Sequence, residues 1–365
     1  MNGGLKMKKI LALALVVALS LSLLAACGGS NSDGGAPAVS ASGSSGGGSS
    51  GGDKKLVIGG AWPSIDVGFW GTNWDGFEDK VNELGCEFVQ VVAERDANKQ
   101  NDQIRNFIAQ KVDAIVLGCV DGSAVVSAVK EAQAAGIPVV MNNRPLQSDS
   151  VVADMSILSD NFLMAYQQLV WLAEDARATG QKHNILMLVG ALSDENMIQR
   201  RKGYTKAIEE NSDVLSLVVE VPTDGKQELA LTGVQNSMQA YNNINCIVTP
   251  ADGYVPTIQS ALEQINRWKK NGEPGYIAIC SFDGAADAMR GYASGHVYCT
   301  AVQDAYGAGA KSAEWAVKLA KGEKPASNVD LDPGLLLTYK NFESIKETIW
   351  GWAVYLNQEA AKAKK

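Results

Sequence analysis

The chain has few of the residues and motifs on which enzymes depend. Only two histidines occur among its 365 residues, His183 and His296, and neither stands beside a cysteine or serine motif that it could activate as a general base. The sequence has no G-x-x-x-x-G-K-[ST] phosphate loop, and no G-x-G-x-x-G opens a helix after a strand. We therefore predict a protein that is not an enzyme and needs no cofactor.

Positive charge and cysteine are also scarce. The chain has 32 Lys and Arg against 40 Asp and Glu, a net charge of −8, whereas nucleic-acid binders normally present a basic surface to phosphates. None of the six cysteines forms a C-x-x-C pair, so zinc and redox sites have no support. The five that follow Cys27 adjoin apolar runs, and an odd number argues against a disulfide framework. We expect buried thiols.

The N-terminus has the layout of a secretory signal. Lys6, Lys8 and Lys9 precede an apolar run over 10–24, which is shorter than a transmembrane helix usually needs. Leu24-Ala25-Ala26-Cys27-Gly28 resembles the lipobox of bacterial lipoproteins. That resemblance implies cleavage of residues 1–26 and lipidation of Cys27, which would anchor the protein to the outer face of a bacterial cell membrane. Residues 27–53, largely Gly and Ser, are expected to be a flexible tether.

From Lys54 onward, short apolar runs alternate with helical patterns, which predicts parallel sheets covered by helices on both faces. The rhythm occurs twice without a low-complexity linker, so two similar α/β domains are expected. The predicted strands are 56–58, 88–92, 114–117, 138–141, 185–189, 217–221, 246–249, 277–280 and 297–301. The predicted helices are 77–84, 103–110, 124–135, 162–178, 197–210, 228–241, 254–270, 285–292 and 305–321.

Polar and aromatic residues follow several of these strands. Ligands of such sheets bind outside the carboxyl ends of the strands, and two sheets would enclose those ends in one cleft. Carboxylates, amides and a guanidinium beside aromatic rings suit a sugar, whose hydroxyls need fixed donors and acceptors and whose C–H face stacks on flat rings. Each residue alone could equally be a cap or turn residue. The candidates are Asp66, Phe69, Trp70, Asp121, Asn142, Asn143, Arg144, Asp252, Asp283 and Gln303.

Three of the eight tryptophans lie in the stretch 62–76. Trp74 begins the series Trp74, Phe77, Val81 and Leu84, whose spacing predicts one buried helical face. Phe69 and Trp70 are expected to precede that helix and face the cleft. For Trp62, packing and cleft wall remain equally open.

From Lys54 to about Leu337 the chain resembles the type I solute-binding proteins of sugar ABC transporters, the ribose- and galactose-binding group. The resemblance is carried by several short motifs in order: Gly68-Phe69-Trp70, Gln133-Ala134-Ala135-Gly136-Ile137-Pro138-Val139-Val140, Asn142-Asn143-Arg144, Ser159-Asp160-Asn161, Arg200-Arg201-Lys202-Gly203-Tyr204, Ser281-Phe282-Asp283-Gly284 and Ala301-Val302-Gln303-Asp304. It implies two Rossmann-like domains joined by three hinge crossovers, near 155–159, 302–304 and 328–333. The domains would comprise 54–158 plus 304–332, and 159–303 plus 333–365.

The resemblance also implies roles for individual residues. Phe69 and Trp70 match stacking aromatics, and Phe282 matches an apolar wall. Arg144 matches the arginine of an acidic–Arg pair, with Asn143 in place of the acid, and Asp283 and Gln303 match polar ligand contacts. Three positions depart from the family pattern: Val67, Ile198 and Ala251. Asn196, Gln199 or Arg200 could replace the arginine missing at Ile198, and Asp252 alone remains of an Asn-Asp pair.

These features together predict a monomeric, lipid-anchored binding protein. It would capture a monosaccharide or small polyol by domain closure and deliver it to an ABC permease. The alternative is a sensory receptor of the same fold that reports a sugar-like signal to a membrane kinase or chemoreceptor.

Overall fold

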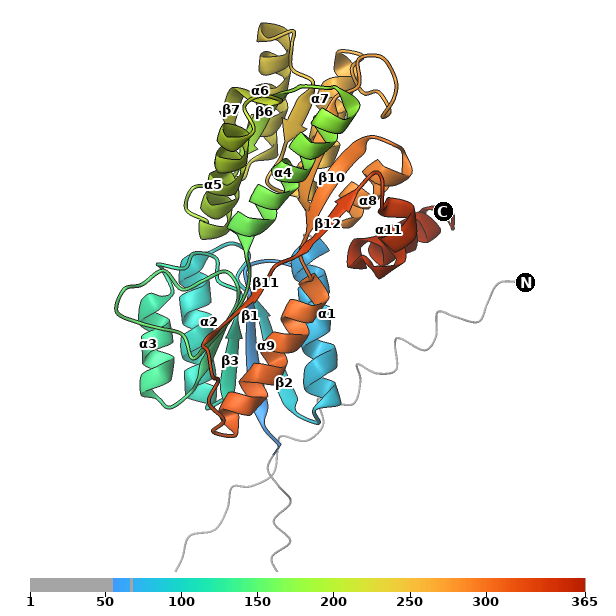
Figure 1. Cartoon of the computed structure of the whole chain (residues 1–365). Coiled ribbons are helices and arrows are strands. Elements are labelled where there is room, and N and C mark those ends of the chain that lie inside the picture. The colour runs from blue at the N-terminus through green and yellow to red at the C-terminus, as the bar shows by residue number, and fades with distance from the viewer. Residues whose placement is uncertain (1–54, 66–67, 365) are drawn as a thin grey trace, which may run out of the picture. The chain divides into compact units, whose positions relative to one another are not determined.

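The computed structural model describes residues 55–65 and 68–364, which form two α/β lobes (Figure 1). The predicted signal peptide, Cys27 and the predicted tether lie outside the described residues, as do Asp66 and Val67. In the described part of the chain, no helix has both the length and the apolar character needed to cross a membrane.

The first sheet belongs to what we call the N lobe. Its strand order is β11-β5-β4-β3-β1-β2, and all its pairs are parallel. Helices α1 and α9 cover one face and α2 and α3 the other. The bounds are β1 Val57–Trp62, β2 Glu87–Val92, β3 Ala114–Leu117, β4 Val139–Asn143, β5 Met155–Ser159, β11 Val329–Asp332, α1 Gly68–Glu83, α2 Ala97–Gln110, α3 Val126–Ala134 and α9 Ala305–Ala320.

The second sheet belongs to the C lobe, with the order β12-β10-β9-β8-β6-β7. Only β12 runs antiparallel, against β10. Helices α4 and α5 cover one face, and α6, α7 and α8 the other, with α11 packed against α8. The bounds are β6 His183–Val189, β7 Leu215–Pro222, β8 Cys246–Val248, β9 Ala278–Asp283, β10 Val297–Val302, β12 Leu335–Thr338, α4 Asn161–Thr179, α5 Glu195–Glu210, α6 Gln227–Ala240, η1 Asp252–Tyr254, α7 Val255–Gln264, α8 Ala286–Ala293, α10 Phe342–Ile345, η2 Lys346–Thr348 and α11 Trp350–Lys362.

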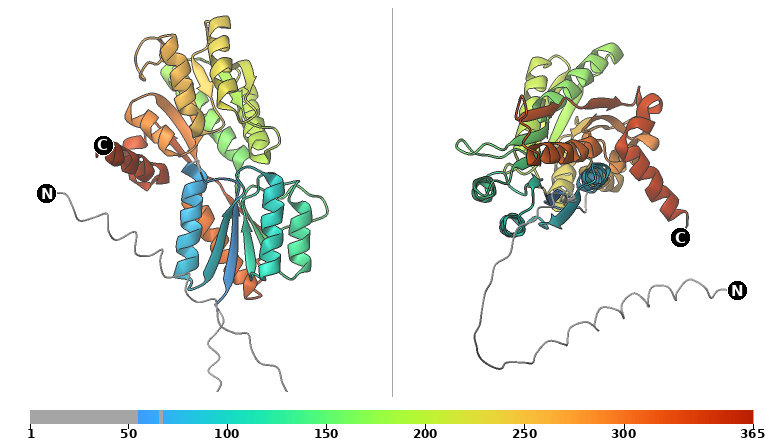
Figure 2. Two further views of the ribbon diagram at one scale, coloured as in Figure 1. Left: turned by 180° about the vertical axis from the view of Figure 1, so that it is seen from behind. Right: turned by 90° about the horizontal axis from the view of Figure 1, so that it is seen from below.

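The chain passes between the lobes three times. It leaves the N lobe between β5 and α4, returns between β10 and α9, and leaves again between β11 and β12. Two further views show the same fold from behind and from below (Figure 2). The predicted fold class, two parallel-sheet α/β domains joined by three crossovers, is therefore confirmed.

Three helices differ from the prediction. Helix α2 begins at Ala97 and not at 103, because the Asp96 carboxylate caps it by accepting bonds from the amides of Asn98 and Lys99. Helix α1 begins at Gly68, so Phe69 and Trp70 lie in its first turn and do not precede it. Burial of both rings against the N-lobe core outweighs the turn-like Gly71 and neighbouring polar residues. Helix α7 ends at Gln264, whereas the periodic pattern ran on to 270. The backbone turns away there because Asn266 adopts a left-handed conformation, with φ of 55°.

The cysteine prediction holds for four of the five described thiols. Cys119, Cys246, Cys280 and Cys299 are buried, and the sulfurs of Cys246 and Cys280 lie 3.9 Å apart. Cys86 is only partly buried, because it stands at the turn between α1 and β2.

A buried carboxylate fastens β12 to the C lobe. Asp175 of α4 is 3% exposed. It accepts a hydrogen bond from the Tyr298 hydroxyl of β10 and pairs with Lys340, which follows β12. The antiparallel edge strand is thus tied to the helix that covers it.

Removal of this carboxylate is expected to destabilise the C lobe. Asp175→Ala leaves the buried Tyr298 hydroxyl without its acceptor, which should lower the free energy of unfolding by about 2–4 kcal/mol. Urea denaturation measures the change. Glu174→Ala, at the neighbouring exposed position, is the control and should change stability by less than about 0.5 kcal/mol. Equal stability of the two variants would contradict the proposed role of Asp175.

Candidate functional site: a cleft between the lobes

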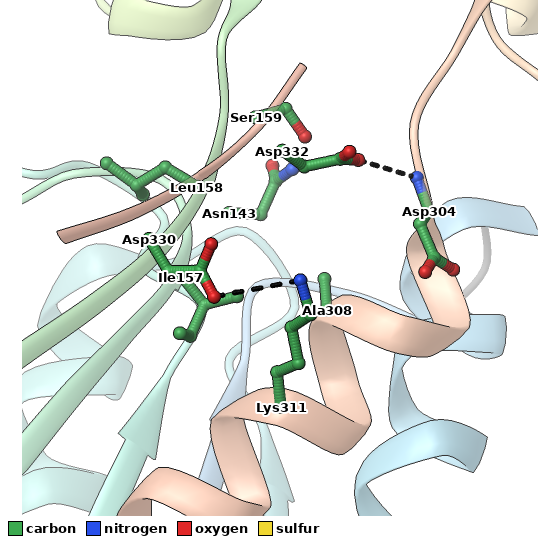
Figure 3. Close-up of a pocket in the computed structure, with 9 residues that line it drawn as sticks. All are labelled: Asn143, Ile157, Leu158, Ser159, Asp304, Ala308, Lys311, Asp330 and Asp332. Carbon is green, nitrogen blue, oxygen red and sulfur yellow. Dashed lines mark hydrogen bonds and ion pairs between the residues drawn. The ribbon is translucent and has the colours of Figure 1, made fainter. Parts of the chain in front are cut away.

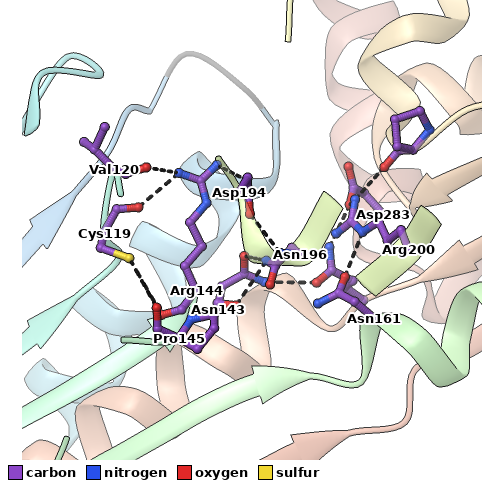
Figure 4. Close-up of polar contacts among 12 residues, drawn as sticks. Cys119, Val120, Asn143, Arg144, Pro145, Asn161, Asp194, Asn196, Arg200 and Asp283 are labelled. Atoms are coloured by element: carbon purple, nitrogen blue, oxygen red, sulfur yellow. Dashed lines mark hydrogen bonds and ion pairs between the residues drawn. The ribbon is translucent and has the colours of Figure 1, made fainter. Parts of the chain in front are cut away.

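Polar side chains from both lobes meet where the strands end (Figure 4). Asn143 closes β4 in the N lobe, and its amide nitrogen donates to Oε1 of Gln303 over 2.9 Å. The side-chain amide of Asn196, from the first turn of α5 in the C lobe, donates to Asn143 Oδ1 over 3.0 Å. Gln303 in turn donates to Asp283 Oδ1 over 2.7 Å. Together with Arg144, Asp194 and Arg200, these residues form what we call the cleft cluster.

Two members of the cleft cluster have unusual backbone conformations. Asn143 has φ of 63° and Asp283 has φ of 113°, a region that costs a non-glycine residue free energy. Both residues end a buried strand and carry the hydrogen bonds described above. Such strain concentrates at functional sites, which supports a binding role for this region.

Arg144 connects the lobes through an ion pair. Its Nη1 donates to the main-chain oxygens of Cys119 and Val120, at 3.0 and 3.1 Å, just beyond β3. Its Nη2 lies 2.9 Å from Oδ2 of Asp194, which belongs to the C lobe. The guanidinium also lies over the Trp70 ring, 5.6 Å from its centroid. The two carbonyls therefore aim the guanidinium across the cleft.

Arg200 is the second cation of the cleft cluster and is 2% exposed. Its Nε donates to Asn161 Oδ1 over 2.7 Å, and its Nη1 lies 3.2 Å from Asp283 Oδ1. The guanidinium stacks on Phe282, with its carbon 3.8 Å from the ring centroid. Phe282 itself is fully buried. The ring predicted as an apolar wall is therefore a platform for Arg200.

Two carboxyl groups of the C lobe have raised pKa values. Burial raises the pKa of Asp283, although the charge of Arg200 opposes the shift. Burial raises the pKa of Asp252 well above its usual value, and the negative charge of the nearby Asp283 raises it as well. Asp252 Oδ2 accepts a bond from the Ala285 amide over 2.6 Å. Asp252 therefore holds the turn that follows Asp283, which places it behind the cleft cluster.

The crowded aromatic stretch divides between core and cleft. Trp62 is fully buried, packs edge-on against Phe77 at 4.9 Å and donates its indole N–H to Asn73. It is therefore a core residue, which resolves the alternative left open by the sequence. Trp74 lies 5.3 Å from Trp62 and is only partly buried. Leu84, the last of its series, is 37% exposed, because α1 has ended.

Phe69 and Trp70 adjoin the cleft cluster. The two rings meet edge to face at 5.2 Å and are 8% and 5% exposed. Trp70 packs so closely that a Cβ on Gly118 would lie 2.7 Å from its ring. Its outer face lies under Arg144. The pair thus forms an aromatic surface beside the polar groups.

A buried amide pair lies beneath the N-lobe half of the cluster. Asn73 of α1 donates to Asn142 Oδ1 over 3.2 Å and to the oxygen of Ala305 over 3.1 Å. Asn142 donates back to Asn73 over 2.7 Å. We call this the Asn73–Asn142 pair. It joins the end of β4, helix α1 and the first residue of α9.

One predicted site residue lies apart from the cluster. The Asp121 carboxylate accepts bonds from the amides of Ser123 and Ala124 and from the Ser123 hydroxyl. The bond from Ser123 is the main reason why the pKa of Asp121 is lowered. These contacts are those of a turn cap before α3.

Two residues of this region escaped the sequence prediction, Asp194 of the cleft cluster and Asn161 beside it. Asp194 does cap α5, since it accepts the Asn196 amide over 3.0 Å, and a cap pattern gives no sign of a second role toward Arg144. Asn161 belonged to a motif of the resemblance, yet only the fold brings it to Arg200. Neither contact leaves a local signal in the sequence.

A small hollow borders Asn143 on the side of the crossovers (Figure 3). Its volume is about 10 Å³, roughly what one water requires. Lys311 and Asp330 form an ion pair on its wall at 3.6 Å. This hollow is too small for a sugar.

Comparison with known sequences decides the family. The sequence model of the periplasmic binding protein domain matches residues 58–324. The chain belongs to this family. As a periplasmic binding protein it falls among binding proteins of transport and not among enzymes, as predicted.

Several relatives of this periplasmic binding protein have been characterised. The ribose import binding protein of Bacillus subtilis is 26% identical over 318 residues, which cover 87% of this chain and 95% of the relative. The D-apiose import binding protein of Actinobacillus succinogenes is 27% identical over 246 residues, 67% of this chain and 75% of that protein. An ABC transporter solute binding protein from Bacillus halodurans, solved with bound myo-inositol, matches with a TM-score of 0.72 and 26% identity, covering 82% of this chain and 99% of that one.

Proposed function

We propose that this periplasmic binding protein captures a neutral monosaccharide or small polyol between its lobes and delivers it to an ABC permease. The cleft cluster is the observation that carries this proposal. Its amides, carboxylates and guanidinium groups offer donors and acceptors in fixed positions, and Phe69 and Trp70 offer flat apolar faces beside them. Hydroxyl groups and the C–H faces of a sugar require this combination.

The charges of the cluster favour a ligand without charge. Arg144 is paired with Asp194, and Arg200 with Asp283. Neither guanidinium is left to balance a ligand carboxylate or phosphate. The ligands named for the relatives agree with this, since D-apiose, ribose and myo-inositol are all uncharged.

Capture would proceed by exchange of hydrogen bonds. Asn143 bonds both to Asn196 and to Gln303, and hydroxyls of an entering sugar would replace those partners. We propose as ligand residues Asp66, Phe69, Trp70, Asp121, Asn143, Arg144, Asn196, Arg200, Asp252, Phe282, Asp283 and Gln303. For Asp252 and Phe282, the contacts described above favour a supporting role behind Asp283 and Arg200. For Asp121, they favour the role of a turn cap before α3.

The remaining features of the proposal concern the whole protein. We infer domain boundaries at 54–158 plus 304–332 and at 159–303 plus 333–365, a monomer, and an extracytoplasmic site of action. We also infer removal of residues 1–26 and anchoring through lipidated Cys27. Mass spectrometry of the protein purified from membranes tests the anchor, since a diacylated Cys27 adds a mass that an unmodified N-terminus lacks.

A ligand screen tests the function. D-Ribose, D-apiose, D-xylose and myo-inositol at 1–10 mM should be compared for the rise in melting temperature that binding produces by mass action. Native mass spectrometry of protein purified from cells identifies a sugar retained in the cleft. Absence of any shift, with no retained sugar, would contradict the proposal.

Transport and sensing are separated by uptake. Deletion of the gene should abolish uptake of the labelled sugar if the protein serves a permease. Unchanged uptake together with a lost transcriptional or chemotactic response to the sugar would support the sensory alternative.

A further inference from the structure

The C-terminal segment, residues 339–364, follows β12 and lies beyond the family match, which ends at residue 324. It nevertheless packs closely against the C lobe. Phe342 of α10 stacks on Tyr292 of α8 at 4.8 Å, and Phe342, Ile349 and Trp352 are buried in the C-lobe core. Helix α11 lies beside α8 (Figure 1). The segment therefore moves with the C lobe.

The start of α11 is seated on the turn that carries Asp283. A Cβ on Gly351 would lie 2.0 Å from the main-chain oxygen of Gly284 and 2.7 Å from the carbonyl carbon of Ala285. Only a glycine permits this approach, because backbone atoms cannot yield as a flexible side chain can. The position of α11 is thus fixed relative to a residue of the cleft cluster.

The position of α11 brings Trp350 into contact with three parts of the molecule. Its indole N–H donates to the main-chain oxygen of Gln303 over 2.8 Å, at the second crossover. Its ring meets Phe69 of the N lobe edge-on, with centroids 6.4 Å apart. A Cβ built on Gly68, at the start of α1, would lie 3.8 Å from the Trp350 ring and equally far from Ala285 Cβ. Trp350 therefore touches both lobes and one crossover.

Trp350 is not an ordinary residue of the hydrophobic core. The indole is only half buried, and it borders a cavity of about 190 Å³ that is lined by residues 302–304, 332, 334, 335 and 348–350. Two of the three crossovers line this cavity, so the ring has free space on the side of the hinge. An indole held between a hinge and two lobes is well placed to respond to their relative motion.

From these contacts we infer that Trp350 is a positioning residue for the ligand. It fixes Gln303 through the backbone and Phe69 through its ring, and its contact with Phe69 joins the C lobe to the N lobe when the cleft is closed. Hinge opening separates Phe69 from Trp350, so the contact favours the closed form and slows ligand release. This inference rests on the proposed function for its ligand and on the lobe contacts for its mechanism.

Ligand kinetics test the inference. With the best sugar of the screen, Trp350→Ala should raise Kd about tenfold through a faster dissociation rate, because closure is less favourable. Trp350→Phe keeps a ring against Phe69 and should recover most of that loss. Trp352→Phe, two residues along the same helix but buried against Phe342 in the C-lobe core, should lower the melting temperature and leave Kd unchanged.

A ligand-free measurement keeps the two proposals apart. Small-angle X-ray scattering of the unliganded protein should show a larger radius of gyration for Trp350→Ala than for the wild type. If no sugar binds the wild type but this expansion is seen, the proposed function fails and the role of Trp350 in closure stands. An unchanged dissociation rate, or without a ligand an unchanged radius, overturns the inference.

Discussion

Asp283→Ala is expected to abolish sugar binding while the protein still unfolds cooperatively. Asp283 joins the second crossover, through Gln303, to the buried cation Arg200. Its loss removes an acceptor for sugar hydroxyls and frees both partners to move. A site built around hydrogen bonds discriminates by several kcal/mol when one partner is missing, so Kd should rise at least about 100-fold, or roughly 2.7 kcal/mol.

The fold should survive this change because Arg200 keeps other partners. Its Nε still donates to Asn161, and its Nη1 donates to the oxygen of Pro250 over 2.5 Å. Calorimetric titration measures Kd, and urea denaturation checks folding. Asp287→Asn removes a carboxylate four residues further on, where Asp287 pairs with Arg290 on α8, and should bind normally.

Arg144→Ala tests the other lobe in the same assay. It removes the ion pair with Asp194 and the cation over Trp70, and we expect binding to be lost with folding intact. Normal binding by either Asp283→Ala or Arg144→Ala would show that the corresponding residue does not hold the ligand.

The second large effect is on stability: Gly76→Ala should destabilise the N lobe by about 2–4 kcal/mol, as expected for overpacking against a backbone that cannot yield. A Cβ on Gly76 would lie 2.2 Å from the main-chain oxygen of Tyr306 in α9. The contact is reciprocal, since a Cβ on Gly309 of α9 would lie 2.0 Å from the oxygen of Asn73 in α1. The two helices are thus packed backbone to backbone.

Gly71→Ala provides the matched control within the same helix. Its added Cβ would meet the Ile65 oxygen at 3.5 Å, an ordinary contact. Alanine also has the higher helix propensity, by about 1 kcal/mol. Urea denaturation should therefore show Gly71→Ala equal to or more stable than the wild type. Equal behaviour of the two alanine variants would disprove the close α1–α9 contact.

Short-range sequence patterns predicted the features that depend on neighbouring residues, namely the strands, the helices and the polar residues at strand ends. Apolar runs and turn residues marked the alternating strands and helices, and polar residues after the strands marked Asn143, Arg144, Asp283 and Gln303. Because parallel strands end at the same edge of a sheet, this sequence feature implies spatial proximity. The meeting of these four residues near the cleft was predictable for that reason.

Long-range contacts account for what the patterns missed. Phe282 stacks against the Arg200 guanidinium because α5 carries Arg200 onto its ring. No residue near Phe282 in the sequence predicts this contact. Asp194 appeared only as a helix cap. Trp350 reaches Gln303 across 47 positions of sequence. The start of α1 was misplaced because core packing of Phe69 and Trp70 outweighs the weak helix propensity of their neighbours.

The Asn73–Asn142 pair has a consequence for the thermodynamics of capture. Because it locks the end of β4 to α1 and to the start of α9, Asn143 and Arg144 follow a strand end that is already rigid. The conformational entropy of ordering this half of the site is then lost during folding, and little remains to be lost when a sugar arrives. Selectivity among hydroxyl patterns can therefore be established at first encounter with the N lobe, before the C lobe closes.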